Sequence, residues 1–189
     1  MELYLRYLPI VLVLGIVLER KRELGINRQT VPGARTDTRS FKLFLLSGFV
    51  GTFGCIAEYV WRGMRPDWPL MLMGVASVIA SFVIRRRAIA ALGKFWSVHV
   101  EMREDHEFVQ SGPFRRMRHP VYFSMILELL GLALILNAWA CFALAMGIFI
   151  PTLIRRLRLE EAALLWQFGA AYEQYQRTTP LLIPWRNGQ

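Results

Sequence analysis

Cysteine and histidine are scarce in this chain, which has two cysteines and three histidines among its 189 residues. Both cysteines, Cys55 and Cys141, lie inside apolar segments, where a thiol more often serves as a small packing residue than as half of a disulfide. No Cys/His spacing typical of a zinc site occurs, so we predict no metal centre. Nothing in the sequence indicates internal repeats or low-complexity segments.

Acidic residues are also few, with 14 Asp and Glu against 23 Lys and Arg, a net charge of +9. Such an excess can indicate nucleic-acid binding. Here, however, the basic residues lie in the connections between apolar segments, as the positive-inside rule for membrane proteins expects. The 54% of hydrophobic residues are gathered into blocks. We therefore predict an integral membrane protein that contacts membrane lipids and binds no nucleic acid.

Five apolar blocks of 16 to 19 residues stand out: Leu3 to Leu18, Leu43 to Trp61, Pro69 to Ile84, Val121 to Leu136 and Ala138 to Ile154. A membrane-spanning helix needs about 20 residues, with about 17 near the lower limit. Flanking Arg, Trp and Tyr residues would complete the shorter crossings. The sequence thus predicts an all-α fold with five transmembrane helices. Only Asn137 separates the last two blocks, and one helix over both would be about 51 Å long, so we expect a helical hairpin.

The basic residues predict the orientation. Six Lys and Arg lie in 19–41, eight in 85–119 and five from residue 155 onward, whereas 62–68 holds two. With five crossings, the three rich segments fall on one side, which places the N-terminus outside and the C-terminus in the cytoplasm. The first block is followed by charged residues and not by a small-residue cleavage site, so we expect it to be retained. The domain boundary we expect separates three N-terminal transmembrane helices, 1–84, from 85–189 within a single membrane domain.

Two cytoplasmic segments are expected to be helical. Residues 85–95 continue the third block, and Arg155 to Tyr175 has apolar residues at helical spacing with Gly169 as its single helix breaker. We expect the second segment to continue from the fifth span and then to cover the cytoplasmic face. An amphipathic helix lying on lipid headgroups is the alternative.

A polar cluster is predicted where the hairpin begins and ends. The hairpin is antiparallel, so its two cytoplasmic ends are neighbours, and His119 and Tyr122 can meet Arg156 and Glu160. Arg156 and Glu160 are four residues apart and share a helix face. Charged groups beside apolar segments indicate a functional site. The structural alternatives are a surface ion pair for Arg156 and Glu160 and a simple helix start at His119-Pro120.

Two carboxylates lie inside predicted spans, Glu58 and Glu128. Such residues usually face the helix bundle or a cavity. They could pair with each other or with Arg62, or be neutral, and Glu128 is also a candidate to bind a substrate.

An ordered series of motifs resembles the isoprenylcysteine carboxyl methyltransferase (ICMT) family of integral-membrane enzymes and, more distantly, the phospholipid N-methyltransferases. The resemblance covers about the C-terminal half, which makes 85–189 the expected catalytic region. The motifs are Leu92-Gly93-Lys94-Phe95-Trp96-Ser97, His106-Glu107-Phe108-Val109, Gly112-Pro113-Phe114, Arg118-His119-Pro120-Val121-Tyr122, Glu160-Glu161-Ala162-Ala163-Leu164, Phe168-Gly169, Tyr172, Tyr175 and Ile183-Pro184.

The resemblance implies that S-adenosylmethionine is the cofactor, bound without a Rossmann domain between the segment before the hairpin and the helix after it. Arg156 and Glu160 are then the catalytic pair, with Arg156 facing the acceptor. The implied cofactor-binding residues are His99, His106, Glu107, Phe108, Val109, Phe114, His119, Pro120, Val121, Tyr122 and Glu160.

His99 occupies a position near the cofactor in relatives, although its residue type is not shared there. Three other positions depart from what the resemblance leads us to expect. Phe114 stands where Tyr is common. Ser124 replaces a frequent Gly and could crowd close helix packing. Glu128 introduces a charge into the fourth span.

The function expected is methyl transfer from S-adenosylmethionine to a lipidic small molecule or lipidated acceptor at the cytoplasmic membrane face. A prenylcysteine-like carboxylate is already a nucleophile, and Arg156 could hold it bidentately. An amine acceptor such as phosphatidylethanolamine would need a base, for which Glu160, Glu161, Glu128 and His119 are candidates. A nicotinamide-dependent reductase and a non-enzymatic membrane scaffold are the other readings.

Overall fold

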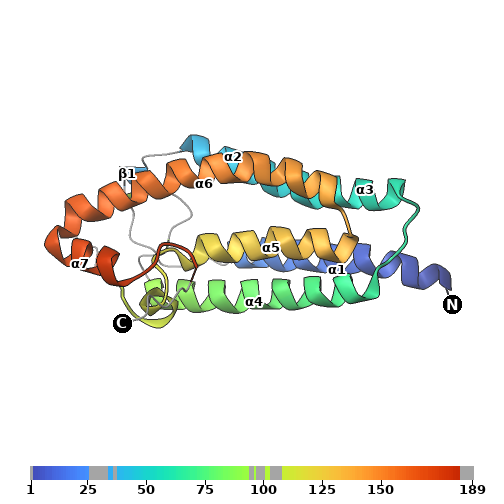
Figure 1. Cartoon of the computed structure of the whole chain (residues 1–189), viewed down its shortest axis with the longest axis horizontal. Helices are drawn as coiled ribbons and strands as arrows, with labels where there is room; N and C mark the ends of the chain where they lie inside the picture. Colours follow the sequence, from blue (N-terminus) through green and yellow to red (C-terminus); the bar gives the residue numbers. More distant parts are fainter. Residues whose placement is uncertain are drawn as a thin grey trace.

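Long helices run side by side through almost all of the molecule (Figure 1). The computed structural model describes residues 2–25, 34–35, 38–93, 96, 101–102 and 108–183. The helices are α1 (Glu2–Gly25), α2 (Thr38–Phe49), a π-helical turn η1 (Val50–Gly54), α3 (Cys55–Trp61), α4 (Trp68–Leu92), a 3-10 turn η3 (Gly112–Arg115), α5 (Pro120–Leu136), α6 (Trp139–Phe168) and α7 (Ala170–Thr178).

One pair of very short strands is the exception to the helical pattern. β1 (Ala34–Arg35) pairs antiparallel with β2 (Glu101–Met102), with Ala34 opposite Met102. The all-α fold class is otherwise confirmed over the described ranges.

Among the described residues, three helical stretches are long and apolar enough to cross a membrane: Lys42–Trp61, Trp68–Leu92 and Trp139–Phe168. The first runs without a break through α2, η1 and α3. α5 is apolar but only 17 residues long. The protein is therefore a helical membrane protein, and the five apolar blocks of the sequence lie within helix apart from Ala138, which precedes α6.

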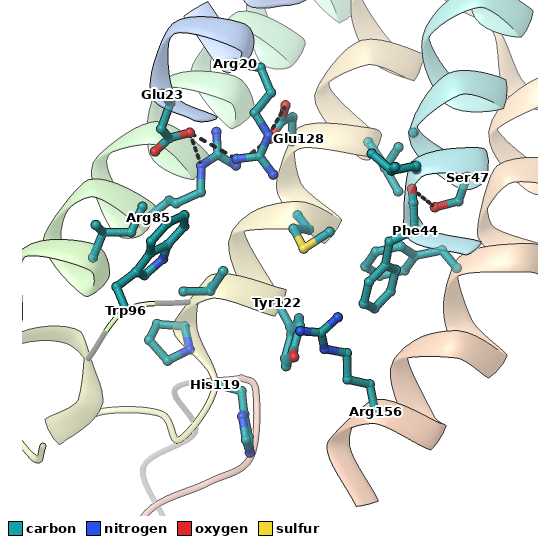
Figure 2. A pocket seen from close by; sticks show the side chains of 18 of the residues that line it. Arg20, Glu23, Phe44, Ser47, Arg85, Trp96, His119, Tyr122, Glu128 and Arg156 are labelled. Carbon is teal, nitrogen blue, oxygen red and sulfur yellow. Dashed lines mark hydrogen bonds and ion pairs between the residues drawn. The ribbon is translucent and has the colours of Figure 1, made fainter. Parts of the chain in front are cut away.

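The helices form two layers with a cavity between them. α1, α4 and α5 lie together on one side, and α2, η1, α3 and α6 on the other (Figure 1). The most extensive helix contacts are α4 with α5 and α2 with α6. Side chains from both layers line the cavity (Figure 2).

Glycine allows α4 and α5 to approach backbone to backbone. A Cβ on Gly74 would lie 2.7 Å from the carbonyl oxygen of Gly131, and a Cβ on Gly131 would lie 2.6 Å from Cγ2 of Val78. Small residues at membrane helix contacts allow such an approach. Further along, the Ser81 hydroxyl donates to the Ser124 carbonyl at 2.7 Å. Ser124 is fully buried in this close contact, so it does not keep the helices apart.

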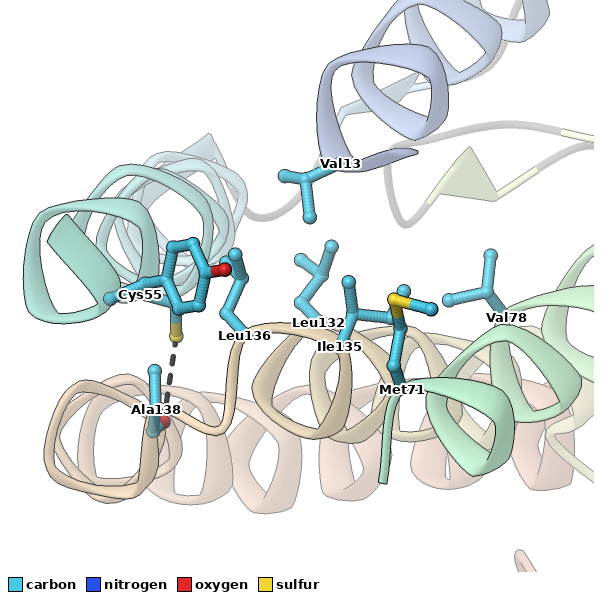
Figure 3. Packing of buried hydrophobic residues seen from close by; sticks show 9 residues of the cluster. Val13, Cys55, Met71, Val78, Leu132, Ile135, Leu136 and Ala138 are labelled. Atoms are coloured by element: carbon cyan, nitrogen blue, oxygen red, sulfur yellow. Dashed lines mark hydrogen bonds between the residues drawn. The ribbon is translucent and has the colours of Figure 1, made fainter. Parts of the chain in front are cut away.

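A hydrophobic core joins the layers beside the α5–α6 turn (Figure 3). Its buried members are Val13, Cys55, Tyr59, Met71, Val78, Leu132, Ile135, Leu136 and Ala138. Within it, the Tyr59 hydroxyl donates to the Arg6 carbonyl at 2.9 Å, which ties α3 to α1. Both cysteines are free, and Cys55 is 1% exposed, which confirms their prediction as packing residues.

The predicted hairpin turns at Asn137. Asn137 adopts the left-handed conformation with φ 48° and ψ 43°, a region that Asn tolerates better than most residues. Glu58 accepts hydrogen bonds from the amides of Ala140 at 3.3 Å and Cys141 at 2.8 Å. It therefore caps the N-terminus of α6, where a negative charge is stabilising. Arg62 donates to the Asn137 carbonyl, so the suggested pairing of Glu58 with Glu128 or Arg62 is wrong.

α6 runs for 30 residues without a break, about 45 Å at 1.5 Å per residue. It ends at Gly169, whose φ of 51° is readily adopted only by glycine. α7 then folds back beneath the end of α6 towards the start of α5 (Figure 1). Tyr172 and Tyr175 on α7 are buried. The inner face of α7 therefore packs against the rest of the protein, as predicted, and does not lie on lipid headgroups.

Candidate functional site

The cavity between the two layers has a volume of about 610 Å3. α1, α2, α4, α5 and α6 all contribute to its walls. Much of the surface is apolar, and charged side chains gather in two places. The predicted site residues that line it are Phe114, His119, Pro120, Val121, Tyr122, Glu128, Arg156 and Glu160.

Glu160 is the centre of the first charged group, which we call the hairpin cluster (His119, Tyr122, Arg156 and Glu160). The Tyr122 hydroxyl donates to Glu160 Oε1, and Arg156 Nε donates to the same oxygen at 3.3 Å. His119 Nδ1 lies 3.5 Å from Glu160 Oε2. The structure thus brings together the four residues that the hairpin argument placed side by side.

Arg156 is held on two sides although it carries a full charge. It is 3% exposed, and its guanidinium carbon lies 5.6 Å from the ring centroid of Phe44 and 5.9 Å from that of Tyr122. Aromatic faces attract cations at such distances. The Arg156 guanidinium is therefore oriented in the cavity before any ligand binds (Figure 2).

Glu161 ties α7 to the start of α5. Its Oε1 lies 2.6 Å from His119 Nε2 and accepts from the Tyr172 hydroxyl at 2.5 Å. Its Oε2 accepts from Gln176 Nε2 at 2.8 Å and from Arg118 Nη1. Both nitrogens of the His119 ring thus face a carboxylate, and the ring orientation is fixed.

Arg118 presents a buried donor near this cluster. Its Nε has no hydrogen-bond partner in the described part of the chain, and the residue lines the cavity. Burial lowers the pKa of the Arg118 guanidinium from its ordinary value, but an arginine stays charged under all ordinary conditions. The amides of Arg118 and His119 donate to the carbonyls of Pro180 and Leu181, at 2.9 and 3.0 Å.

Phe108 lies in an aromatic group against α6 and α7. Its ring centroid is 5.3 Å from that of Phe168, 5.5 Å from Tyr172 and 5.1 Å from Tyr175. The Tyr175 hydroxyl donates to the Phe114 carbonyl at 2.6 Å, and burial raises the Tyr175 pKa to about 12. These contacts support the cavity wall from behind.

The remaining predicted cofactor residues do not add to the cavity wall that the structure describes. Phe108 and Val109 are half-buried and are not among the described residues that line the cavity. His99, His106 and Glu107 lie outside the described residues.

A second charged group, the α5-flank cluster (Arg20, Glu23, Arg85 and Glu128), lies on the side of α5 that faces α1 and α4 (Figure 2). Arg85 Nε donates to Glu23 at 2.9 Å, and Arg85 Nη1 donates to Glu128. Arg20 Nη1 donates to Glu23 at 3.0 Å, and Arg20 Nε lies 3.9 Å from Glu128. Arg85 is 1% exposed, so Glu128 is paired with arginines of α1 and α4.

Phe44 and Arg85 line the cavity but were not predicted as site residues from the sequence. Arg85 had been counted with the basic residues of a connecting segment. The available signal was helical phase, since Gly74, Val78, Ser81 and Arg85 follow each other at spacings of three or four residues and all are buried. No comparable signal marks Phe44, which reaches the site because α2 packs on α6.

Known proteins resemble this chain along most of its length. A sequence profile of the isoprenylcysteine carboxyl methyltransferase (ICMT) family matches residues 72–166. The uncharacterized protein YpbQ of Bacillus subtilis is 30% identical over 81% of this chain and 94% of its own length. Protein-S-isoprenylcysteine O-methyltransferase B of Arabidopsis thaliana is 27% identical over 77% of this chain and 76% of its own.

A solved structure shares the fold. It is that of the eukaryotic intramembrane Ras methyltransferase ICMT, with a TM-score of 0.63 and 26% identity over 79% of this chain. The chain spans about half of that protein, 54% of its length. The profile covers the hairpin, most of α4 and most of α6, which hold both charged clusters apart from the residues of α1. The chain therefore belongs to the isoprenylcysteine carboxyl methyltransferase family of membrane methyltransferases.

Proposed function

We propose that this chain transfers a methyl group from S-adenosylmethionine to the carboxylate of a lipidic acceptor at the cytoplasmic face of the membrane. The observation that carries the proposal is the hairpin cluster, a buried arginine and a half-buried glutamate beside His119 and Tyr122 in a cavity with apolar walls. A soluble charged cofactor needs such polar groups, and a lipid tail needs the apolar walls.

The residues present fit the cofactor's chemistry. The Glu160 carboxylate could accept from its amine or its ribose hydroxyls, and the buried Arg118 Nε is a free donor for its carboxylate. The backbone amides of Arg118 and His119 already donate to Pro180 and Leu181, so they do not serve that carboxylate. Phe114 and Tyr122 line the same wall and could pack on the adenine or on the sulfonium. The bound cofactor would supply an activated methyl group.

Arg156 is the residue we assign to the acceptor. Its guanidinium could hold a carboxylate bidentately, while Glu160 and the rings of Phe44 and Tyr122 fix its direction. Methyl transfer is an in-line displacement in which the protein mainly positions the reactants. A carboxylate acceptor needs no proton removed, so no side chain has to act as a base.

An amine acceptor, such as a phosphatidylethanolamine headgroup, is the second candidate. The observation in its favour is that Glu128 lines the cavity. Arg85 and Arg20 already engage that carboxylate, so its charge is offset, and this supports the carboxylate acceptor instead.

The membrane arrangement we propose has five crossings, formed by α1, the stretch from α2 to α3, α4, α5 and α6. The N-terminus is outside and the C-terminus is cytoplasmic, as the basic connections suggest. α5 spans about 26 Å at 1.5 Å per residue, so flanking residues would complete its crossing of a core of about 30 Å. In this arrangement 1–84 supplies three helices and 85–189 is the catalytic region.

Methyl transfer from labelled S-adenosylmethionine tests the proposal. Purified protein in neutral detergent is offered an N-acetyl-S-prenylcysteine and, separately, phosphatidylethanolamine. We expect label in the prenylcysteine ester. Label in phosphatidylethanolamine alone would overturn the assignment of a carboxylate acceptor, but it would still support a membrane methyltransferase. A folded protein that binds no S-adenosylmethionine by calorimetry would overturn the whole proposal and favour a membrane scaffold.

A further inference from the structure

The α5-flank cluster contains a buried donor that no described residue satisfies. Arg85 uses Nε for Glu23 and Nη1 for Glu128 and Ser81, whereas its Nη2 has no partner in the described part of the chain. A guanidinium carries five N–H donors, and leaving a buried donor without an acceptor is unfavourable. Arg85 is 1% exposed and lines the cavity.

The ion pairs of this cluster leave one donor of Arg85 unused. Arg20 and Arg85 balance the charges of Glu23 and Glu128. A purely structural ion-pair network would be expected to satisfy its donors as well, and this one leaves Arg85 Nη2 without an acceptor in the described part of the chain. An anionic oxygen in the cavity would supply that acceptor.

The position of the cluster separates it from the hairpin cluster. Glu128 follows Tyr122 by six residues on α5, about 9 Å of helix rise. Figure 2 shows Arg85 and Glu128 on the side of α5 towards α1 and α4, with Tyr122 and Arg156 towards α6. One cavity thus contains two polar centres, and apolar residues such as Met125 and Leu129 line it as well.

We propose that Arg85 forms a second recognition point in the cavity, which binds an anionic oxygen of the lipidic acceptor away from the reacting group. This rests on the proposed function in that the ligand is the methyl acceptor. The acceptor then carries two polar groups, one at Arg156 that is methylated and one at Arg85 that is not. The shared chemistry of the second group is an oxyanion, either a phosphate or a carboxylate.

Binding of three probes with one alkyl chain tests this inference: dodecyl phosphate, dodecanoate and dodecanol. Each is titrated by calorimetry into the full chain in neutral detergent. We expect the anions to bind at least about tenfold more tightly than the alcohol, the difference that one charge-assisted hydrogen bond provides. Preference for the phosphate indicates a phospholipid-like second group, and preference for the carboxylate indicates a free acid.

Arg85→Lys removes the free Nη2 donor and keeps the charge. We expect the preference for anions to fall to about threefold or less, because the ammonium is occupied by Glu23 and Glu128. The matched control is Arg86→Lys, the same change at the adjacent residue, which pairs with Glu19 on the exposed surface. The control should keep the preference. Equal binding of the three probes to the wild type, or equal losses in both variants, would overturn the inference.

Glu128→Gln, titrated with the same three probes, provides a second test if Arg85→Lys does not fold. This change removes a negative charge beside Arg85 and replaces a charge-assisted hydrogen bond to Nη1 by a weaker neutral one, so we expect anions to bind several-fold more tightly. No gain would contradict the inference.

Calorimetry with S-adenosylmethionine on the same samples distinguishes the two proposals. If the wild type shows no preference for anions but still binds S-adenosylmethionine, only the proposed second recognition point is contradicted. If the wild type prefers anions but binds no S-adenosylmethionine, the proposed methyl transfer is contradicted and the cavity is instead a binding site for anionic lipids.

Discussion

Helix α5 packs in opposite ways on its two sides. Towards α4, glycines at 74 and 131 bring the two backbones together without room for a Cβ. Towards the cavity and α6, α5 presents Tyr122, whose hydroxyl donates to Glu160. The comparison shows how one short helix can be a fixed base and a cavity wall, because close packing on one side holds the polar groups of the other side in place.

The largest expected effect is on the cavity side, at Glu160. Glu160→Ala removes the acceptor shared by Tyr122 and Arg156 and the proposed partner of the cofactor's amine. We expect the affinity for S-adenosylmethionine to fall about hundredfold, as for loss of a buried charge-assisted contact. Calorimetry in detergent measures it. Glu173→Ala, which breaks an exposed pair with Arg177, is the control and should bind normally. Normal binding by folded Glu160→Ala would remove Glu160 from the cofactor site.

Arg156→Ala should separate acceptor from cofactor. We expect methyl transfer to fall about ten- to hundredfold, because a charge-assisted contact to the acceptor is lost. The dissociation constant for S-adenosylmethionine should change by less than about threefold. The control is Arg158→Ala, on the exposed face of the same helix. Equal losses of transfer and binding would place Arg156 against the cofactor.

Gly131→Ala addresses the packed side of α5. The added Cβ would lie 2.6 Å from Val78 Cγ2 and 2.9 Å from the Gly74 carbonyl oxygen. Overpacking of this kind costs about 1–3 kcal/mol, so we expect a lower thermal midpoint in detergent. Gly147→Ala on α6 is matched to it, since a Cβ there meets nothing within 4 Å, and should be neutral or slightly stabilising. Similar midpoints for both variants would mean that the α4–α5 contact is looser than described.

Glu58→Ala is the smallest change and concerns a carboxylate with a structural role only. Losing the cap of α6 should cost about 1 kcal/mol of stability, which a thermal melt detects. Methyl transfer per folded molecule should be unchanged, since Glu58 lies at the opposite end of α6 from the site. A fall in transfer at full stability would show that Glu58 does more than cap a helix.

The sequence was sufficient for one charged cluster and not for the other. The hairpin cluster follows from topology, because an antiparallel turn at Asn137 makes neighbours of His119 and Glu160 whatever the rest of the fold does. The α5-flank cluster depends on how α1 packs. Arg85 meets Glu23 and Glu128 across 62 and 43 residues of sequence, and no pattern in the chain links them. A charge inside an apolar block indicated only that some partner exists.

Side-chain directions explain the other differences. Phe108 belongs to a motif that the family resemblance placed on the cofactor wall, and the structure puts its ring among aromatics of α6 and α7. Glu58 faces the N-terminus of α6 because α3 ends beside the turn. Periodicity identifies the helix that carries a residue, but the partner it meets depends on how neighbouring helices are rotated.

The turn at Asn137 also makes assembly of the site independent of the direction in which the chain enters the membrane. α5 runs away from the site and α6 returns to it, so Tyr122 and Glu160 always emerge on the same side. Reversing the whole chain would change the compartment that supplies the soluble methyl donor and would leave the hairpin cluster intact. In the proposed orientation the basic connections select the compartment, whereas the left-handed turn at Asn137 brings the two halves of the site together.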